Sequence, residues 1–300
     1  MTNVADPTKR CRGGRARASA APPAAGIAAR PSTAPPASES EPRALPRALP
    51  IDDSWAETIA RRLEGRVALV TGGGSGLGRA TCEVLAEAGL HVVAGDVAED
   101  GLDGTVDLLA GRGLAALPVH LDVTDAVSAD RAVRAAIGAF GRIDVLVNNA
   151  GVDRTAAFEE LDLVDWERIV GVNLLGPVIM TRAVLPTMRA AGTGHIVNIA
   201  STAAKRAWEN ASAYHATKWA LLGLSHALHT EARQVGVKVT AFVCGGMRTP
   251  FLLERFPDID PATLQDPRGV AEAIRFTLAL PEETVIPEIT VLPMRETSWP

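Results

Sequence analysis

Three side chains able to share acid–base chemistry lie in the segment NIASTAAKRAWENASAYHATK: Ser201, Tyr214 and Lys218. Tyr214 and Lys218 are one helical turn apart, so they project from the same face of a helix. An ammonium group near a phenol favours the phenolate and lowers a pKa that starts at about 10. This pairing predicts a tyrosine acid/base, with Ser201 donating a hydrogen bond to a carbonyl oxygen bound beside it. A Tyr and a Lys that merely lie on the surface of one helix would have the same spacing. However, Tyr214 is the only tyrosine in the chain, which favours a catalytic role.

A glycine-rich turn, TGGGSGLG from Thr71 to Gly78, separates a predicted strand from the helical sequence RATCEVLAEAG. Residues without Cβ let the backbone approach a pyrophosphate, whose charge the positive end of the following helix stabilises. The alternative is a loop whose glycines serve only to turn the chain. The position between a strand and a helix favours a dinucleotide site.

The carboxylate of Asp96 follows the second predicted strand, where it can accept hydrogen bonds from the adenosine ribose hydroxyls. A 2′-phosphate would meet a like charge there, and Ser75 offers it no basic side chain. The sequence therefore predicts NAD(H) in preference to NADP(H). Asp122, after the third strand, is expected either to bond the adenine ring or to form a turn.

Short β-branched or leucine-rich runs alternate with alanine-rich helical stretches from Val67 onward, as in βα units around a parallel sheet. We expect strands at 67–71, 91–95, 114–119, 143–148, 195–200, 237–243 and 288–292, and helices near 77–88, 99–111, 125–139, 162–190, 212–235 and 268–280. Asp125 and Ser212 are the expected N-caps, and Pro177 and Pro186 should kink or interrupt the fourth helix. The prediction is a single α/β domain with a doubly wound, seven-stranded parallel sheet of Rossmann type.

Five motifs in this order and spacing resemble the short-chain dehydrogenase/reductase family, in its single-domain subgroup: TGGGSGLG, NNAG at 148–151, Asn173 in VGVNLLG, Ser201, and YHATK with Tyr214 and Lys218. The resemblance extends from about Leu63 to the C-terminus. It implies that Tyr214 is the catalytic acid/base, that Ser201 positions the carbonyl or alcohol, and that Lys218 also binds the nicotinamide ribose. It further implies that Asn173 holds a water that completes a proton relay.

These arguments predict two sets of site residues and no metal ligands. The predicted catalytic residues are Asn173, Ser201, Tyr214 and Lys218. The predicted cofactor-binding residues are Gly72, Ser75, Gly76, Leu77, Gly78, Asp96, Asp122, Val123, Asn149, Ala150, Gly151, Tyr214, Lys218 and Thr249. His226, His229 and Glu231 have a spacing that metal ligands use, but no further ligand pattern supports a metal site.

The segment after the sixth strand departs from the family pattern, because Cys244-Gly245 stands where a proline-glycine pair is usual. The missing proline is expected to give this loop more freedom, and Cys244 is expected to be a packed thiol. Met247, Phe251 and Leu252 follow in the usual place of a substrate lid. Trp208 is expected to form part of the wall of the substrate pocket. Their apolar character predicts a hydrophobic or alicyclic substrate, although simple loop packing would explain them equally well.

Composition divides the chain in two. Residues 1–54 are rich in Ala, Pro, Arg and Ser, and we expect a disordered tail there, followed by the domain at 55–300. A transit peptide or a nucleic-acid arm would also be basic, but the prolines oppose the helix that a transit peptide uses. The acidic remainder argues against nucleic acid as a ligand. No uncharged apolar run is long enough for a membrane span or a signal peptide, and the three scattered cysteines are expected to be free thiols, so we expect a cytoplasmic protein.

The leading interpretation is an NAD(H)-dependent oxidoreductase that interconverts a secondary alcohol and a ketone by hydride transfer. An epimerase or dehydratase of the extended relatives would have a different glycine spacing and a longer C-terminal domain. A regulatory protein that binds the cofactor without turnover is the alternative from another class, but such proteins typically lose the tyrosine or the lysine. The predicted helices at 162–190 and 212–235 are apolar on more than one face, so they are expected to contact a partner. The family resemblance implies that these two helices pair across a twofold axis and that the C-terminal strand meets its copy in a second interface. We therefore expect a homotetramer, or otherwise a homodimer.

Overall fold

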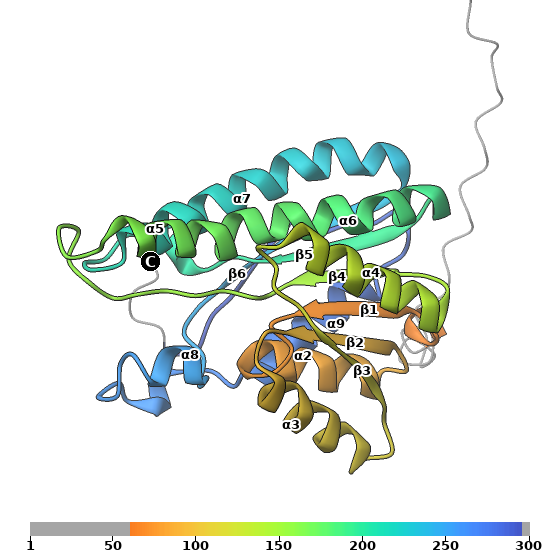
Figure 1. The fold of residues 1–300 in the computed structure, drawn as a ribbon, viewed down its shortest axis with the longest axis horizontal. Coiled ribbons are helices and arrows are strands. Elements are labelled where there is room, and N and C mark those ends of the chain that lie inside the picture. Colours follow the sequence, from red (N-terminus) through yellow and green to blue (C-terminus); the bar gives the residue numbers. More distant parts are fainter. Residues whose placement is uncertain (1–60, 296–300) are drawn as a thin grey trace, which may run out of the picture. The chain divides into compact units, whose positions relative to one another are not determined.

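The computed structural model describes residues 61–295. The predicted tail, residues 1–54, and both ends of the predicted domain lie outside this range. Within it, seven strands form one parallel sheet in the order β3-β2-β1-β4-β5-β6-β7 (Figure 1). This confirms the doubly wound, Rossmann-type α/β fold.

The elements follow the predicted alternation of strands and helices. The strands are β1 Val67–Thr71, β2 His91–Asp96, β3 Ala116–His120, β4 Val145–Asn148, β5 Gly194–Ile199, β6 Val237–Cys244 and β7 Glu288–Val291. The helices are α2 Gly76–Glu87, α3 Glu99–Ala110, α4 Ala126–Phe140, α5 Leu163–Val170, α6 Gly176–Ala191, α7 Ser212–Ala232, α8 Pro250–Leu253 and α9 Pro267–Leu278.

Two apolar cores hold helices on both faces of the sheet. One core joins α2, α3 and α9 to the sheet, and the other joins α4 and α6 to its opposite face (Figure 1). The strands β1 and β4 are buried along their whole length, which is why their sequences VALVT and VLVN are apolar without alternation. The chain winds outward from β1 to β3 and returns at β4, so the crevice for a ligand lies beyond the carboxyl ends of β1 and β4.

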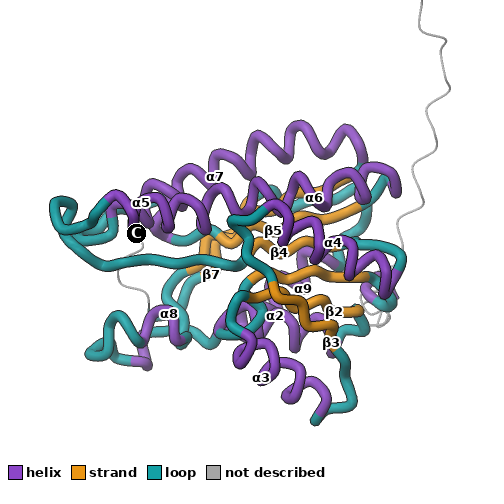
Figure 2. Tube along the Cα trace, viewed as in Figure 1, coloured by secondary structure: helices purple, strands orange, loops and turns teal. Residues whose placement is uncertain are grey.

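The long connections after β4, β5 and β6 gather at one end of the sheet (Figure 2). They follow the carboxyl ends of their strands, since all the strands are parallel. At the opposite end the turns are short, and β3 begins two residues later than predicted. The reason is local: Leu114 N–H donates to Leu109 O at 3.0 Å to close α3, with Gly113 left-handed at φ +71°.

The predicted helix at 162–190 is two helices joined by a π-helical turn. This turn, Gly171–Leu175, contains Asn173 and separates α5 from α6. Pro177 lies at the start of α6, where its missing N–H leaves the Asn173 carbonyl without its α-helical donor. The predicted interruption is therefore confirmed at Pro177, whereas α6 continues through Pro186.

The two predicted N-caps have different outcomes. Asp125 caps α4, since its carboxylate accepts from Val127 N at 3.0 Å and from Ser128 N at 3.2 Å. The prediction for Ser212 is wrong. The N-cap of α7 is Ala211, whose carbonyl already accepts from His215 N at 2.9 Å, and the Ser212 hydroxyl is buried with no hydrogen-bond partner among the described residues.

By length and composition alone, the helical stretch Leu163–Ala191 could cross a membrane, with a mean hydropathy of 1.6 in its most apolar window. In this fold, however, apolar side chains of this stretch pack in the protein core. Met180, Val184 and Met188 are fully buried in the core that joins α6 to the sheet. The structure therefore uses α6 as a core helix.

Candidate active site

A cavity of about 1100 Å³ lies beyond the carboxyl ends of β1, β2, β4, β5 and β6. It brings most of the predicted site residues together. Those that line it are Gly72, Ser75, Gly76, Leu77, Asp96, Asp122, Val123, Asn149, Ala150, Gly151, Ser201, Tyr214, Lys218 and Thr249. Gly78 and Asn173 do not line the cavity, but they contact Gly72 and Val152, which do.

The glycine turn forms a cradle that side chains would fill. A Cβ on Gly78 would lie 1.9 Å from Gly72 O, so only glycine allows α2 to start this close to β1. Gly76 has φ +50°, a left-handed conformation that favours glycine. The N-cap Ser75 makes no side-chain hydrogen bond to the helix, and the first turn of α2 contains no acidic residue. The first amides of α2 therefore suit the pyrophosphate of a dinucleotide.

Asp96, at the end of β2, forms the next part of the cavity wall. Its Oδ2 accepts from Gly74 N at 2.9 Å and its Oδ1 accepts from Ala98 N at 3.0 Å. Each carboxylate oxygen keeps a second lone pair for a ribose hydroxyl. The contact with Gly74 ties this carboxylate to the glycine turn, so the positions predicted to bind the ribose and the pyrophosphate are fixed together.

Arg79, which the sequence argument did not consider, also lines this part of the cavity. Its Nη2 donates to Gly74 O at 2.6 Å and its Nε donates to Thr105 Oγ1 at 3.1 Å. The guanidinium therefore braces the turn against α3. Its position directly after Gly78 was the available signal.

The remaining predicted cofactor residues follow β3 and β4. Asn149 donates from Nδ2 to Thr71 O at 2.9 Å and to Gly72 O at 3.1 Å, and so holds the start of the turn. Of the two uses considered for Asp122, the structure shows the turn: its Oδ1 accepts from Thr124 N at 2.9 Å and from Thr124 Oγ1 at 2.7 Å. Val123, Ala150 and Gly151 lie in the wall between them.

Tyr214 and Lys218 lie together on α7, as their spacing predicts. The Lys218 ammonium lies 5.5 Å from the centre of the Tyr214 ring and donates to Ile199 O at 2.8 Å. Only 4% of Lys218 is exposed, and burial lowers its pKa to about 8. A lysine held at the end of β5 in this way can donate to a ribose hydroxyl while it faces the phenol.

The predicted lowering of the Tyr214 pKa is wrong for this structure. Burial raises the pKa of Tyr214 to about 12, while the hydrogen bond with Ser201 and the charge of Arg255 act in the opposite direction. The effect of desolvation on this pKa exceeds the two opposing effects because the phenol is buried in the cavity wall. Tyr214 is therefore a neutral phenol at neutral pH, the form that donates a proton.

Ser201 and Asn173 have different positions relative to Tyr214. Ser201 follows β5, accepts from Ala203 N at 3.1 Å through its hydroxyl oxygen, and keeps its proton for Tyr214 or a bound oxygen. The side chain of Asn173 pairs with the backbone of Val152, accepting from its N at 2.8 Å and donating to its O at 2.8 Å. Its Nδ2 also donates to Thr217 Oγ1 of α7 at 3.3 Å. Asn173 thus positions the loop after β4, and its role in holding a water stays a prediction.

The segment that lacks the family's proline is held by backbone hydrogen bonds. Gly245 N donates to Val291 O at 2.9 Å, and Gln265 N donates to Gly246 O at 3.1 Å. Thr249, 5% exposed, packs where a Cβ on Gly76 would contact it. Cys244 is buried, and burial raises its pKa to about 12, so its thiol stays protonated and serves as packing.

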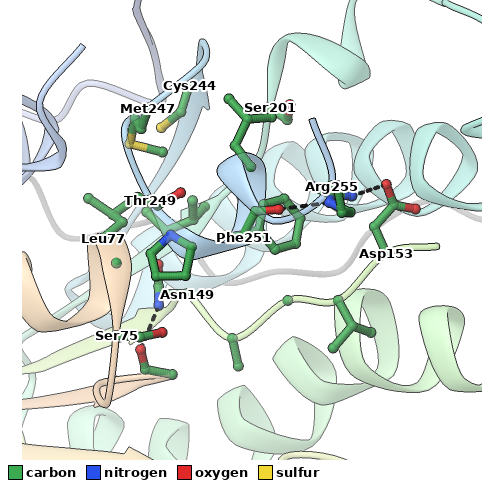
Figure 3. Close-up of a pocket in the computed structure, with 18 of the residues that line it drawn as sticks. Ser75, Leu77, Asn149, Asp153, Ser201, Cys244, Met247, Thr249, Phe251 and Arg255 are labelled. Carbon is green, nitrogen blue, oxygen red and sulfur yellow. Dashed lines mark hydrogen bonds and ion pairs between the residues drawn. The ribbon is translucent and has the colours of Figure 1, made fainter. Parts of the chain in front are cut away.

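Two side-chain contacts at the other end of the cavity were not predicted. Asp153, after β4, forms an ion pair with Arg255, after α8 (Figure 3). His215 Nε2 accepts from Trp208 N at 3.2 Å, which leaves Nδ1 to donate to Ala203 O at 2.9 Å. The Trp208 and His215 rings are in edge contact with centroids 4.2 Å apart, so His215 holds Trp208 against the cavity, whose lining includes Trp208 as predicted.

The histidines considered as metal ligands do not converge with their proposed carboxylate. His226 Nε2 contacts Glu288 Oε2 at 3.0 Å, which joins α7 to β7. Burial lowers the pKa of His229, with the charge of Arg233 acting in the same direction. The spacing that suggested ligands serves packing and an ion pair on α7.

Comparison with known proteins gives three relevant similarities. The chain is 39% identical over 212 residues to the 2,5-dichloro-2,5-cyclohexadiene-1,4-diol dehydrogenase of Sphingobium indicum, covering 70% of this chain and 85% of that one. A 3-ketoacyl-(acyl-carrier-protein) reductase from Brucella melitensis, solved with NADH, superposes with a TM-score of 0.70 at 33% identity, covering 78% of this chain and 99% of that one. An alcohol dehydrogenase from the archaeon Thermococcus sibiricus, solved with 5-hydroxy-NADP, gives a TM-score of 0.71 at 27% identity, with coverage of 78% and 99%.

The model of the short chain dehydrogenase family matches residues 66–260, from the start of β1 to beyond the lid helix α8. The match therefore includes the glycine turn, Asp96, Ser201, Tyr214 and Lys218. Both kinds of nicotinamide cofactor occur among the solved relatives. The chain belongs to the short-chain dehydrogenase family and is an oxidoreductase that acts on CH–OH groups.

Proposed function

We propose that this protein is an NAD(H)-dependent oxidoreductase that interconverts a secondary alcohol and a ketone, with Tyr214 as the acid/base. The single observation that carries the proposal is the placement of Tyr214, Lys218 and Ser201 in the cavity that the glycine turn opens into. A nicotinamide dinucleotide, when bound, supplies the hydride acceptor or donor.

The protein's own part in this reaction is to hold the substrate oxygen and move one proton. In reduction, the neutral phenol of Tyr214 donates its proton to the oxygen of the ketone, while Ser201 donates a hydrogen bond to the same oxygen. In oxidation, Tyr214 must first lose its proton and then accept one from the alcohol. Lys218, which is largely an ammonium below its pKa of about 8, favours that phenolate.

Several features of the cavity support NAD(H) as the cofactor. The glycine turn and the uncapped amides of α2 suit the pyrophosphate, Asp96 suits the ribose hydroxyls, and Lys218 and Thr249 line the same cavity and suit the nicotinamide riboside. A 2′-phosphate would stand against the Asp96 carboxylate. The guanidinium of Arg79, which also lines the cavity, is engaged with Gly74 O and Thr105.

The proposed substrate has a largely apolar body. Trp208, Met247, Phe251 and Leu252 line the cavity, and the Tyr214 and Phe251 ring centroids are 5.9 Å apart. The Sphingobium relative acts on a cyclic diol, which supports an alicyclic alcohol or ketone of similar size.

We further propose a cytoplasmic homotetramer. The outer face of α7 exposes Ala216, Trp219, Ala220, Gly223 and Ala227, small or apolar side chains suited to a second copy. Light scattering at micromolar concentration tests this assembly, and a mass near the 31.4 kDa of one chain would contradict it.

The central experiment is to mix the purified protein with NADH and a panel of cyclic ketones and to follow absorbance of the reduced nicotinamide. We expect turnover with at least one ketone, and the reverse reaction with NAD and the matching alcohol. Cofactor binding without turnover across the panel would support the regulatory alternative instead.

A further inference from the structure

A buried ion pair joins two connections that close the substrate end of the cavity. Asp153 follows β4, and Arg255 follows the lid helix α8, 102 residues later. Their side chains are 5% and 19% exposed. Arg255 Nη1 donates to Asp153 Oδ2, and Arg255 Nε donates to Phe251 O at 2.7 Å (Figure 3). Both residues line the cavity.

The two oxygens of the Asp153 carboxylate are used unequally. Oδ2 accepts from Arg255, whereas Oδ1 is buried and has no hydrogen-bond partner within residues 61–295. Burial raises the pKa of this carboxyl group, and the charge of Arg255 and the backbone N–H of Arg154 oppose the rise. A buried carboxylate oxygen without a donor is costly. Because Asp153 lines the cavity, a ligand bound there can supply the donor.

The pair is linked to the acid/base through one aromatic ring. The Phe251 and Tyr214 ring centroids are 5.9 Å apart, and the Arg255 guanidinium carbon lies 3.8 Å from the Phe251 centroid. The lining also contains the apolar side chains of Trp208 and Met247 and the polar side chains of Thr155 and Glu254. The ion pair therefore offers a charged, hydrogen-bonding group that is joined to the acid/base through Phe251.

We propose that Asp153, held by Arg255, recognises a second hydroxyl group of the substrate, remote from the reacting carbon. The substrate class is then a diol, or the corresponding hydroxyketone, whose two oxygens lie on opposite sides of an apolar body the size of a six-membered ring. This inference rests on the proposed function, since it assigns the far end of the same alcohol or ketone.

The charges of the pair select a neutral hydroxyl over a charged group. A carboxylate on the substrate would face Asp153, and an ammonium group would face Arg255. A hydroxyl can donate to Asp153 Oδ1 and accept from the guanidinium without adding charge to a buried site. A methyl group in the same place would leave the carboxylate oxygen without a partner.

The test compares two alcohols of equal size, 1,4-cyclohexanediol and 4-methylcyclohexanol, with NAD. We expect the wild-type protein to favour the diol in kcat/KM by about tenfold or more, in keeping with a hydrogen bond to a charged group. Asp153→Ala should lower the ratio of the two kcat/KM values by about 10- to 100-fold. Because both alcohols are measured on one preparation, this ratio does not depend on the fraction of folded protein.

Two further variants separate recognition from a merely structural clamp. Asp165→Ala removes another carboxylate that pairs with an arginine, Arg154, but lies outside the cavity lining, and it should leave the ratio within about twofold. The double variant Asp153→Leu, Arg255→Met replaces the pair by apolar side chains and should reverse the preference toward 4-methylcyclohexanol. If Asp153→Ala slows both alcohols equally, the pair only fastens the lid and the inference is overturned.

A binding measurement distinguishes failure of this inference from failure of the proposed function. Saturation-transfer NMR of the two alcohols with the NADH-loaded protein needs no turnover. Stronger saturation of the diol that is lost in Asp153→Ala supports the inference even if neither alcohol is oxidised, an outcome that contradicts only the proposed reaction. Equal saturation of both alcohols, unchanged by the substitution, overturns the inference.

Discussion

The two walls of the cavity are built in different ways. On the cofactor side, Gly74, Asp96 and Asn149 are joined mostly through backbone groups, and the spacing between Gly72 and Gly78 leaves no room for a Cβ. On the substrate side, the contacts are between side chains: Asp153 with Arg255, and Trp208 with His215. The first wall is fixed by the path of the chain, whereas the second can change without moving the sheet.

This difference teaches which part of the site determines which property. Replacing a side chain in the first wall displaces backbone and should affect every substrate equally. Replacing one in the second should change the choice of substrate and leave the cofactor in place. Tyr214 lies between the walls and serves both.

The largest effect is expected from Tyr214→Phe. This change removes the hydroxyl that transfers the proton and keeps the ring that packs against Phe251. We expect kcat to fall by about 100-fold or more while the Kd for NADH changes little. Steady-state kinetics and a fluorescence titration with NADH measure the two quantities, and turnover within about tenfold of wild type would exclude Tyr214 as the acid/base.

Gly78→Ala tests the rigidity of the cofactor wall. Its Cβ would stand 1.9 Å from Gly72 O and 2.6 Å from Asn149 Nδ2, so the turn must move. We expect a lower melting temperature and NADH binding weakened by about tenfold or more for any substrate, because overpacking costs about 1–3 kcal/mol. Gly138→Ala in α4 is the matched control: nothing lies within 4 Å of its Cβ, and we expect unchanged binding and equal or higher stability.

The two directions of the reaction should differ in pH dependence. The pKa of Tyr214 is raised to about 12, so the phenol is protonated throughout the neutral range. Alcohol oxidation needs the phenolate, and its kcat/KM should rise as the pH rises from 7 to 9, by up to about tenfold per unit. The rise should be steepest below the Lys218 pKa of about 8, because the ammonium that favours the phenolate loses its charge above it. Ketone reduction uses the phenol and should not rise. An oxidation rate that falls over this range would contradict the assignment.

The smallest effect concerns the choice of cofactor. Asp96→Ala combined with Val97→Arg removes the carboxylate and places a guanidinium at a position where Val97 is 58% exposed. We expect the ratio of kcat/KM for NAD to that for NADP to fall by about tenfold, since one charge contact at a partly exposed site changes. Wild-type preference for NADP would refute the role given to Asp96. Asp125→Asn, a cap outside the cavity, serves as the control.

The cofactor wall could be predicted from the sequence because it is local. Ser75, Gly76 and Asp96 belong to one βα unit and the strand that follows it, so strand and helix patterns alone bring them together. Tyr214 and Lys218 could be paired because one helical turn relates them. Their spacing of four residues predicted that both side chains project from the same face of the helix.

The substrate wall could not be predicted in this way. Asp153 and Arg255 lie 102 residues apart, and neither forms a motif. The raised pKa of Tyr214 was missed because the spacing of Tyr214 and Lys218 says nothing of the burial that raises this pKa. The use of the Asn173 side chain depends on a π-helical turn that a regular 3.6-residue period does not reveal.

The π-helical turn Gly171–Leu175 also separates two parts of one apolar stretch, α5 and α6, which pack in different cores. Before it, Ile169 of α5 packs with Leu161 and with Ala213 of α7. After it, Met180 and Val184 of α6 pack against the sheet. Because the stretch supplies apolar side chains to two cores, its most apolar window has a mean hydropathy of 1.6, as high as that of a candidate membrane span. One extra residue in the turn lets a single apolar segment supply two separate cores.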